Sequence, residues 1–406
     1  MNKLTDANSL YDAGTLAIKS SNFKYATQMY EMNHLVETAE LQRDLKTGNY
    51  KPVEGTKFPI QERGKMRYIT SNAMRDKTVN HVLCDEVVTP AIKPYLIHDN
   101  GASQKGKGVS FSRRRFEEHL HRYYMEHHSN EGWVLLTDFS GYYANILHDK
   151  CKTILNSMIF PMLDTEEERD MVSDLMEHIF RSFETDVSYL PDEEIEKLYH
   201  SKLDPLMNMN VPQKLLTGEK TLKKGADIGN QLSQSIGIVY PYRIDNYVKI
   251  IKGCKYAARH TDDSYIIHHD KEFLKEVFAG VKKIAQEYGI IINEKKTRIV
   301  KLSSFFRFLQ IGYTLTDTGR VIKKINPKNI TRERRKLKAY KRQLDLGKLD
   351  YATIENSFKS WLGANWKVMS RRQIRNMNSL YKELFGKVVT WEKKKNSRLC
   401  WLMEHA

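Results

Sequence analysis

The chain has few of the features that mark secreted, metal-stapled or membrane proteins. Its 406 residues include only four cysteines, which do not have the spacing of metal ligands: Cys84, Cys151, Cys254 and Cys400. There is no signal-peptide pattern at the N-terminus, no apolar run near the ~18 residues that a membrane span needs, and no internal repeat. We therefore expect a cytoplasmic protein with reduced thiols and no membrane partner.

Acidic residues are outnumbered, with 50 Asp and Glu against 66 Lys and Arg, and the net charge is +16. Two acidic stretches, 164–170 and 192–196, leave the remainder more basic still. Such a balance favours a polyanionic partner. The length allows two or three subdomains, each with its own core.

Two acidic motifs lie about 120 residues apart. The apolar, β-prone run 133–137 ends at Asp138, and strand-like runs 255–259 and 264–268 flank the pair Asp262 and Asp263. Asp is common in turns, so both residues of the pair are predicted at the tip of a β-hairpin. The plainer alternative is that the pair is an ordinary hairpin turn and Asp138 a helix N-cap.

Three carboxylates in one cleft repel one another unless a cation lies between them. Magnesium prefers oxygen ligands, and two such ions about 3.5–4 Å apart support nucleotidyl transfer. If the strands are neighbours, the two motifs supply that cluster. We expect two Mg²⁺ ions, with Mn²⁺ as an alternative.

Other segments carry basic or helical patterns. The run 58–70 indicates a basic hairpin that turns at Gly64, and 76–97 a helix ended by its prolines. The segment 164–200 is predicted to be helical and solvent-exposed, 225–252 to become one long helix, and 289–293 and 306–314 to form strands. Helices are expected over 329–345, 351–366 and 370–386, the first strongly basic.

In this order, the motifs resemble bacterial reverse transcriptases of the retron, group II intron and diversity-generating retroelement kind. The resemblance covers about residues 30–386. It rests on segments that begin at these positions: Lys65-Met66-Arg67, Arg75-Asp76-Lys77, Asp138-Phe139-Ser140, Ile228-Gly229-Asn230-Gln231, His260-Thr261-Asp262-Asp263, Asn293-Glu294-Lys295-Lys296, Phe308-Leu309-Gln310 and Ser357-Phe358-Lys359. Singly these motifs are weak, but their ordered set is specific.

The resemblance implies roles for individual residues. Asp138, Asp262 and Asp263 correspond to the catalytic, metal-binding carboxylates, and Phe139 is counted with the metal ligands. The implied nucleotide-binding residues are Lys65, Arg67, Tyr143, Gly229 and Gln231, with Tyr143 as the gate against a ribose 2′-hydroxyl. Lys296 is implied as the proton donor to pyrophosphate, and Phe308, Leu309 and Gln310 as the primer grip.

Three positions depart from the family's pattern. His260 stands where Tyr is usual, Gln310 where Gly is usual, and Ala144 where Pro is common. None of these removes a metal ligand, so we expect activity with altered primer or template use.

The expected fold is therefore α+β, a right-hand polymerase with fingers, an antiparallel palm sheet and a helical thumb. The expected domains are N-terminal helices and fingers (1–125), palm (126–320, with an inserted segment at about 160–225), basic thumb (321–386) and basic tail (387–406).

The expected function is RNA-directed DNA synthesis from dNTPs on a structured noncoding RNA in anti-phage defence. Alternatives are mutagenic reverse transcription in a diversity-generating retroelement and a non-catalytic RNA-binding subunit. The partners would be the RNA template and the DNA product, with a homo-oligomer or partner protein left open.

Overall fold

The computed structural model is a mixed fold of helices and small antiparallel sheets. It describes residues 3–19, 21–53, 55–62 and 64–389. The chain divides into two compact units: Met1–His119 with Val134–Ile299, and Leu120–Trp133 with Val300–Ala406. This division is coarser than fingers, palm and thumb. No helix in the described ranges is both long and apolar enough to cross a bilayer.

The first unit begins with helices that pack around α4 (Met74–Leu83). They are α1 (Ala7–Lys19), α2 (Tyr25–Met32) and α3 (His34–Lys46). The predicted basic hairpin is confirmed as β1 (Thr56–Glu62) and β2 (Lys65–Ser71), which pair antiparallel. Gly64 adopts φ 80° at the turn between them, a backbone conformation that costs glycine little.

The helix predicted over 76–97 continues past its prolines as a series of short segments. The segments are η2 (Cys84–Val88, a π-helix), α5 (Thr89–Ile92) and η3 (Lys93–Tyr95). Pro90 and Pro94 each lie in the first turn of a new segment. A proline is tolerated there because the first N–H groups of a helix need no partner within it. The expectation that these prolines end the helix was wrong.

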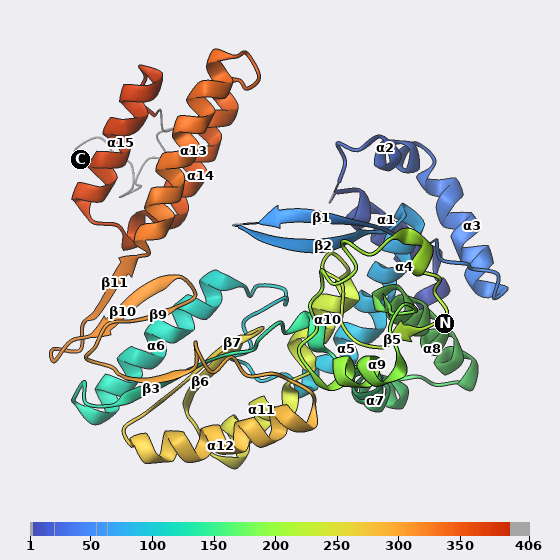
Figure 1. Cartoon of the computed structure of the whole chain (residues 1–406), viewed down its shortest axis with the longest axis horizontal. Helices are drawn as coiled ribbons and strands as arrows, with labels where there is room; N and C mark the ends of the chain where they lie inside the picture. Colours follow the sequence, from blue (N-terminus) through green and yellow to red (C-terminus); the bar gives the residue numbers. More distant parts are fainter. Residues whose placement is uncertain (1–2, 20, 54, 63, 390–406) are drawn as a thin grey trace. The chain divides into compact units, whose positions relative to one another are not determined.

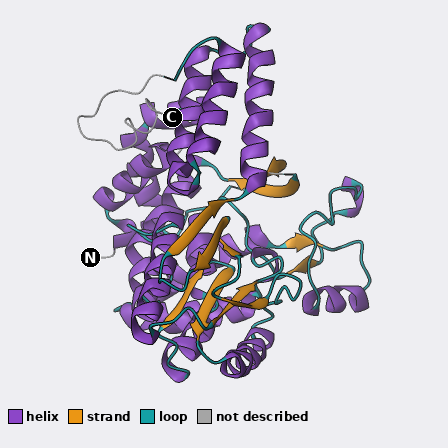
Figure 2. Cartoon of the chain, turned by 90° about the vertical axis from the view of Figure 1, so that its left-hand side faces the viewer, coloured by secondary structure: helices purple, strands orange, loops and turns teal. Residues whose placement is uncertain are grey.

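The central sheet has the strand order β6-β7-β3-β8 (Figures 1 and 2). Its strands are β3 (Trp133–Asp138), β6 (Tyr256–His260), β7 (Asp263–His268) and β8 (Arg298–Lys301). Helix α6 (Val109–His127) brings Phe116 edge-on to Tyr265 of β7, with ring centroids 4.5 Å apart. Helix α12 (Lys271–Glu287) buries Val277 and three further apolar residues. The strands that carry the acidic motifs are therefore set in a packed core.

Two predicted elements between these strands differ from expectation. The long helix of 225–252 is instead α10 (Gln231–Val239), α11 (Tyr242–Asn246) and the π-helical η7 (Tyr247–Ile251). Pro241 precedes α11 and has no N–H to continue the helical ladder. The strand predicted at 289–293 is only a single bridge between Phe139 and Ile292. The turn over 294–296 follows at once and leaves no room for a longer ladder.

The acidic segment is helical, but it is not a free solvated face. Helix α8 (Glu166–Phe183) buries an apolar stripe of six residues that includes Leu175 and Phe180. Helix α9 (Asp192–His200) has no buried residue, and β4 (Thr185–Asp186) pairs with β5 (Thr221–Leu222). Helix α7 (His148–Ile159) leads into this region. The acidic residues lie on the outer side of helices whose inner side the sequence reading overlooked.

The second unit contains a small sheet followed by three helices. The sheet order is β11-β10-β9, from β9 (Phe306–Phe308), β10 (Ile311–Leu315) and β11 (Val321–Ile325). The three predicted helices are confirmed as α13 (Pro327–Asp345), α14 (Tyr351–Asn365) and α15 (Arg371–Phe385), which lie side by side (Figure 1). Phe358 and Tyr381 stack in their core, with ring centroids 4.7 Å apart. Most of the expected basic tail, 390–406, lies outside the described residues.

Candidate active site

The two acidic motifs meet at one end of the central sheet. Asp138 is the last residue of β3, and Asp262 lies in the two-residue turn between β6 and β7. The backbone N–H of Phe139 donates to the carbonyl of Asp262 at 3.2 Å. Asp263 is already the first residue of β7, paired with His260, so only one of the two adjacent Asp residues is in the turn. The prediction that both lie in the turn was wrong by one residue.

A third segment completes the cluster from the other side of Asp138. The N–H of Asn293 donates to the Asp138 carbonyl at 2.8 Å, and the Asn293 side-chain amide donates to Oδ2 at the same distance. Lys296 Nζ donates to both carboxylate oxygens of Asp138, at 2.7 and 3.0 Å. Sequence reasoning identified Lys296 but assigned no role to Asn293. Their separation of three residues in one turn was the available signal.

The electrostatics show that the carboxylates share one environment. Burial raises the pKa of Asp263 to about 7, and the negative charges of Asp262 and Asp138 raise it further, against the opposing effect of Lys296. Burial lowers the pKa of Lys296, but the ion pair with Asp138 outweighs it and raises that pKa overall. The site thus concentrates negative charge that a cation would relieve.

The donor chemistry suits magnesium, although the side chains do not yet form a closed set. Carboxylate oxygens and a backbone carbonyl such as that of Phe139 are the ligands that Mg²⁺ prefers. Within the described ranges, no three His, Cys, Asp or Glu side chains are gathered closely enough to hold a metal ion. The cation beside Asp138 is the Lys296 ammonium. Asp138, Asp262 and Asp263 would hold the ions if that ammonium gave way.

Arg259 fastens the catalytic hairpin from below and was missed by the sequence reading. Its guanidinium is 2% exposed and forms a two-point ion pair with Asp245 of α11, at 2.8 and 2.6 Å. The same group donates to the carbonyl of Ile238 at 2.7 Å and to that of Thr261, in the turn, at 3.1 Å. Four contacts from one rigid group therefore tie the turn to α10 and α11.

His260, which replaces the usual Tyr, is held by the segment before α6. Its Nδ1 lies 2.9 Å from Ser112 Oγ and 3.2 Å from the Gly101 carbonyl. Burial lowers the pKa of the ring. The imidazole thus contributes to attaching the hairpin to the neighbouring loop.

Tyr143 lies in the short helix η4 (Tyr143–Asn145), next to α10. A Cβ atom built on Gly237 of α10 would lie 2.3 Å from the Tyr143 hydroxyl oxygen, so the ring occupies the space that this glycine leaves. Burial raises the pKa of Tyr143 to about 12, and the charge of Asp262 contributes to the rise. The expected sugar gate therefore lies within the field of the carboxylate site.

Gly229 permits a close approach, but to the fingers hairpin. It adopts φ 113°, and a Cβ there would lie 3.3 Å from both Ile69 Cγ2 and the Thr70 carbonyl. Ile228 forms a parallel bridge with Ile69 on β2. Gln231 donates to Asp85 of η2 at 2.7 Å. The structure thus shows Gly229 and Gln231 connecting this loop to the hairpin and to η2.

The remaining predicted site residues lie farther from the carboxylates in sequence. On β2, Arg67 is exposed opposite Ile60, and Lys65 pairs with Glu62, its side chain lying outside the described part. The primer-grip segment belongs to the second unit and joins β9 to β10. Leu309 and Gln310 there have φ values of 44° and 71°, which explains why a glycine suits the Gln310 position.

The chain matches no protein family and no curated protein. Similar solved structures include apo telomerase from Candida tropicalis truncated from its C-terminal domain, at 13% identity and TM-score 0.44, over 68% of this chain and 58% of that chain. Telomerase from Candida albicans with a TWJ fragment of telomeric RNA aligns at 12% identity and TM-score 0.44, over 83% and 60%. The chain spans about three-fifths of the length of these telomerase chains.

Proposed function

We propose that the chain is an RNA-directed DNA polymerase. The observation that carries the proposal is the convergence of Asp138, Asp262 and Asp263 in one electrostatic environment at the end of the sheet, with Lys296 on Asp138. Three carboxylates drawn from separate segments are costly to hold together for structure alone. They suit a reaction that needs cations at a phosphate.

In the proposed reaction, the primer 3′-hydroxyl oxygen forms a bond to the α-phosphorus of a dNTP. The bond from that phosphorus to the β-phosphate oxygen breaks, pyrophosphate leaves, and the hydroxyl proton passes to solvent. Two Mg²⁺ ions held by Asp138, Asp262 and Asp263 would supply charge stabilisation. Lys65 and Arg67 are proposed to bind the triphosphate, Tyr143 to exclude a 2′-hydroxyl, and Lys296 to protonate the pyrophosphate.

The basic second unit would grip the template–product duplex through phosphates. Helix α13 carries a run of cationic residues whose pattern suits backbone contacts rather than base reading. These residues are Arg332, Arg334, Arg335, Lys336, Lys338, Lys341 and Arg342. Sequence would then be read by base pairing, with Phe308, Leu309 and Gln310 on the primer.

For the cellular role we favour copying of a dedicated noncoding RNA in anti-phage defence, because His260 and Gln310 depart from the diversity-generating pattern. Diversity-generating mutagenesis is the alternative. Neighbouring genes decide between them: a variable target gene with paired repeats indicates diversification.

A non-catalytic RNA-binding subunit is the second candidate function. The observation that favours it is the ion pair of Lys296 with Asp138, in which an internal cation already neutralises a carboxylate that should bind metal.

The test is primer extension on an RNA template with Mg²⁺, comparing the wild type with Asp262→Asn. We expect the variant to keep its melting temperature and to lose incorporation. Asp317→Asn, an exposed aspartate in another hairpin turn, is the matched control and should stay active. An active Asp262→Asn would contradict the polymerase assignment, and a wild type that binds RNA without extending a primer would favour the binding subunit.

A further inference from the structure

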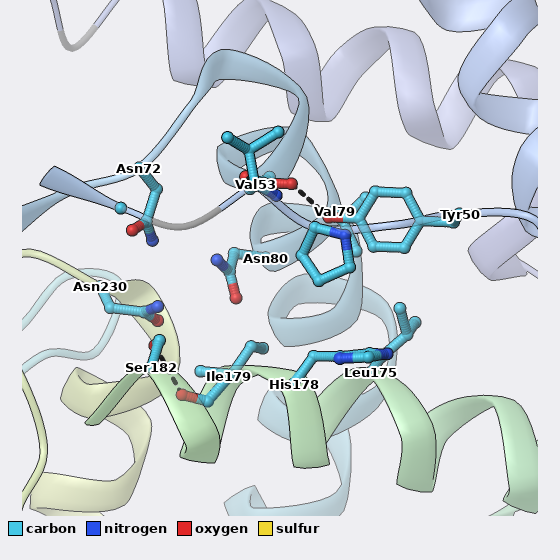
Figure 3. Close-up of a pocket in the computed structure, with 13 residues that line it drawn as sticks. Tyr50, Val53, Asn72, Val79, Asn80, Leu175, His178, Ile179, Ser182 and Asn230 are labelled. Atoms are coloured by element: carbon cyan, nitrogen blue, oxygen red, sulfur yellow. Dashed lines mark hydrogen bonds between the residues drawn. The ribbon is translucent and has the colours of Figure 1, made fainter. Parts of the chain in front are cut away.

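A pocket away from the carboxylate site opens between the base of the fingers hairpin, α4 and α8 (Figure 3). It is open to solvent, and its empty volume is about 410 Å³ with the mouth included. This is at the lower end of the range of small-ligand sites, ~300–1,000 Å³. Its apolar walls come from Val53, Val79, Leu175 and Ile179.

Three carboxamides with unused hydrogen-bonding groups surround the open space. Asn80, in the middle of α4, is 6% exposed, and its buried Oδ1 has no hydrogen-bond partner among the described residues. Asn230 uses its Oδ1 to cap α10 through the Leu232 N–H at 2.8 Å, which leaves its NH₂ group for other partners. The amide of Asn72 lies at the same space (Figure 3). A buried amide left without a partner is costly, so Asn80 indicates a missing ligand.

The charge of the pocket narrows the class of ligand. The charged group on its wall is the carboxylate of Asp76, which accepts hydrogen bonds from the Tyr50 hydroxyl at 2.6 Å and the Val53 N–H at 3.1 Å. Burial raises the pKa of Asp76. A carboxylate wall disfavours phosphates and other anions. Apolar sides with convergent amides suit a neutral, planar heterocycle with both donors and acceptors on its edge.

We propose that this pocket binds one unpaired nucleobase of a single RNA strand. A carboxamide can pair with the edge of a base through one donor and one acceptor, and unpaired bases of RNA are the ones that proteins hydrogen-bond in this way. Asn80 supplies the buried contact, Asn230 and Asn72 contact the base from the rim, and Val79 and Ile179 cover its faces. The inference rests on the proposed function only in expecting an RNA strand nearby.

The test is an abasic scan without catalysis. A fluorescent single-stranded RNA has its bases removed one position at a time, and the dissociation constants are measured by anisotropy for the wild type, Asn80→Leu and Asn156→Leu. Asn156 is the matched control because its amide oxygen is also buried without a partner, but it lies on α7 and does not line the pocket.

We expect one abasic position to weaken wild-type binding by about tenfold, the size of one base contact. That position effect should disappear in Asn80→Leu and persist in Asn156→Leu. Equal sensitivity at all positions, or a position effect that survives Asn80→Leu, would overturn the proposal. If Asn80→Leu fails to fold, Asn72→Leu at the half-buried rim serves instead and should reduce the same position effect.

Two further arms separate this proposal from its neighbours. Free adenosine, cytidine, guanosine and uridine are added as competitors, and saturable, Asn80-dependent binding of a nucleoside without a position effect would show a free-nucleoside site and overturn the strand proposal. Asp262→Asn protein should give the same abasic pattern as the wild type. A chain without polymerase activity can therefore still support the pocket, and a failed abasic scan leaves the polymerase assignment standing.

Discussion

Arg259 should be needed for activity beyond its contribution to folding. Arg259→Met removes the cation from a fully buried ion pair and leaves the Asp245 carboxylate with little water around it. It also removes the donors to the Ile238 and Thr261 carbonyls. The first loss acts on stability, whereas the loss at Thr261 acts on the turn that carries Asp262.

The two effects can be separated by removing the opposite charge. Leaving one charge of a buried pair unpaired typically costs ~3–5 kcal/mol, whereas replacing both partners with apolar residues is often close to neutral. Arg259→Met alone should therefore be strongly destabilised, and Arg259→Met with Asp245→Leu should recover most of that loss. The double variant still lacks the donor to Thr261. A displacement of a catalytic group by about 1 Å costs on the order of 100-fold in rate.

The assay combines denaturant unfolding with single-nucleotide incorporation on a fixed RNA template. We expect the double variant to unfold near the wild-type midpoint but to show a kcat about 100-fold lower, at a similar KM for the dNTP, from the misplacement of Asp262. Arg75→Met is the control, because it breaks an ion pair with Asp44 (2.6 Å) in the N-terminal helices. It should lower stability and leave the rate per folded molecule unchanged. If activity recovers together with stability in the double variant, Arg259 acts through folding alone and the reasoning is refuted.

Two further predictions concern the sugar gate and pH. Gly237→Ala should displace the Tyr143 ring, because the new Cβ would lie 2.3 Å from its hydroxyl oxygen; ribonucleotide use relative to dNTP use should rise, as in Tyr143→Ala, and an unchanged ratio in competition assays would remove Tyr143 from the gate. Burial lowers the pKa of His148 to about 4, so between the unfolded value near 6.5 and pH 4 the unfolded state binds a proton that the folded state does not. The free energy of unfolding should fall by about 1.4 kcal/mol per pH unit over that window, and His148→Gln, followed by urea unfolding at several pH values, should reduce that slope.

Local patterns predicted the elements that carry the acidic motifs. The apolar run before Asp138, the paired β-prone runs around Asp262 and the turn at Gly64 all became strands and hairpins near the expected residues. The periodic helices of the second unit were also predicted correctly. These elements share a cause: their conformation follows from side-chain alternation or periodicity within a few residues of the chain.

Long-range partners decided what the sequence left open. Nothing within the neighbourhood of Arg259 indicates that its partner is Asp245, 14 residues earlier, or that its donors reach Ile238. The segment before Asn293 is apolar and strand-like, but it meets only Phe139 in a single bridge. The buried stripe of α8 lies among so many acidic residues that composition hid it.

Lys296 shows how a correct choice of residue can come with an incomplete account of what it does. The family resemblance identified it through pyrophosphate, but its ammonium lies on Asp138 at 2.7 Å, where the proposed reaction needs a metal ion. A lysine whose side chain is 61% exposed can leave that carboxylate at little cost, because water can solvate the ammonium once it is released. The same group would then be free to reach the leaving pyrophosphate. The ion pair is thus compatible with catalysis if Lys296 leaves Asp138 when metal and nucleotide enter, and the pair keeps the carboxylate cluster folded before they do.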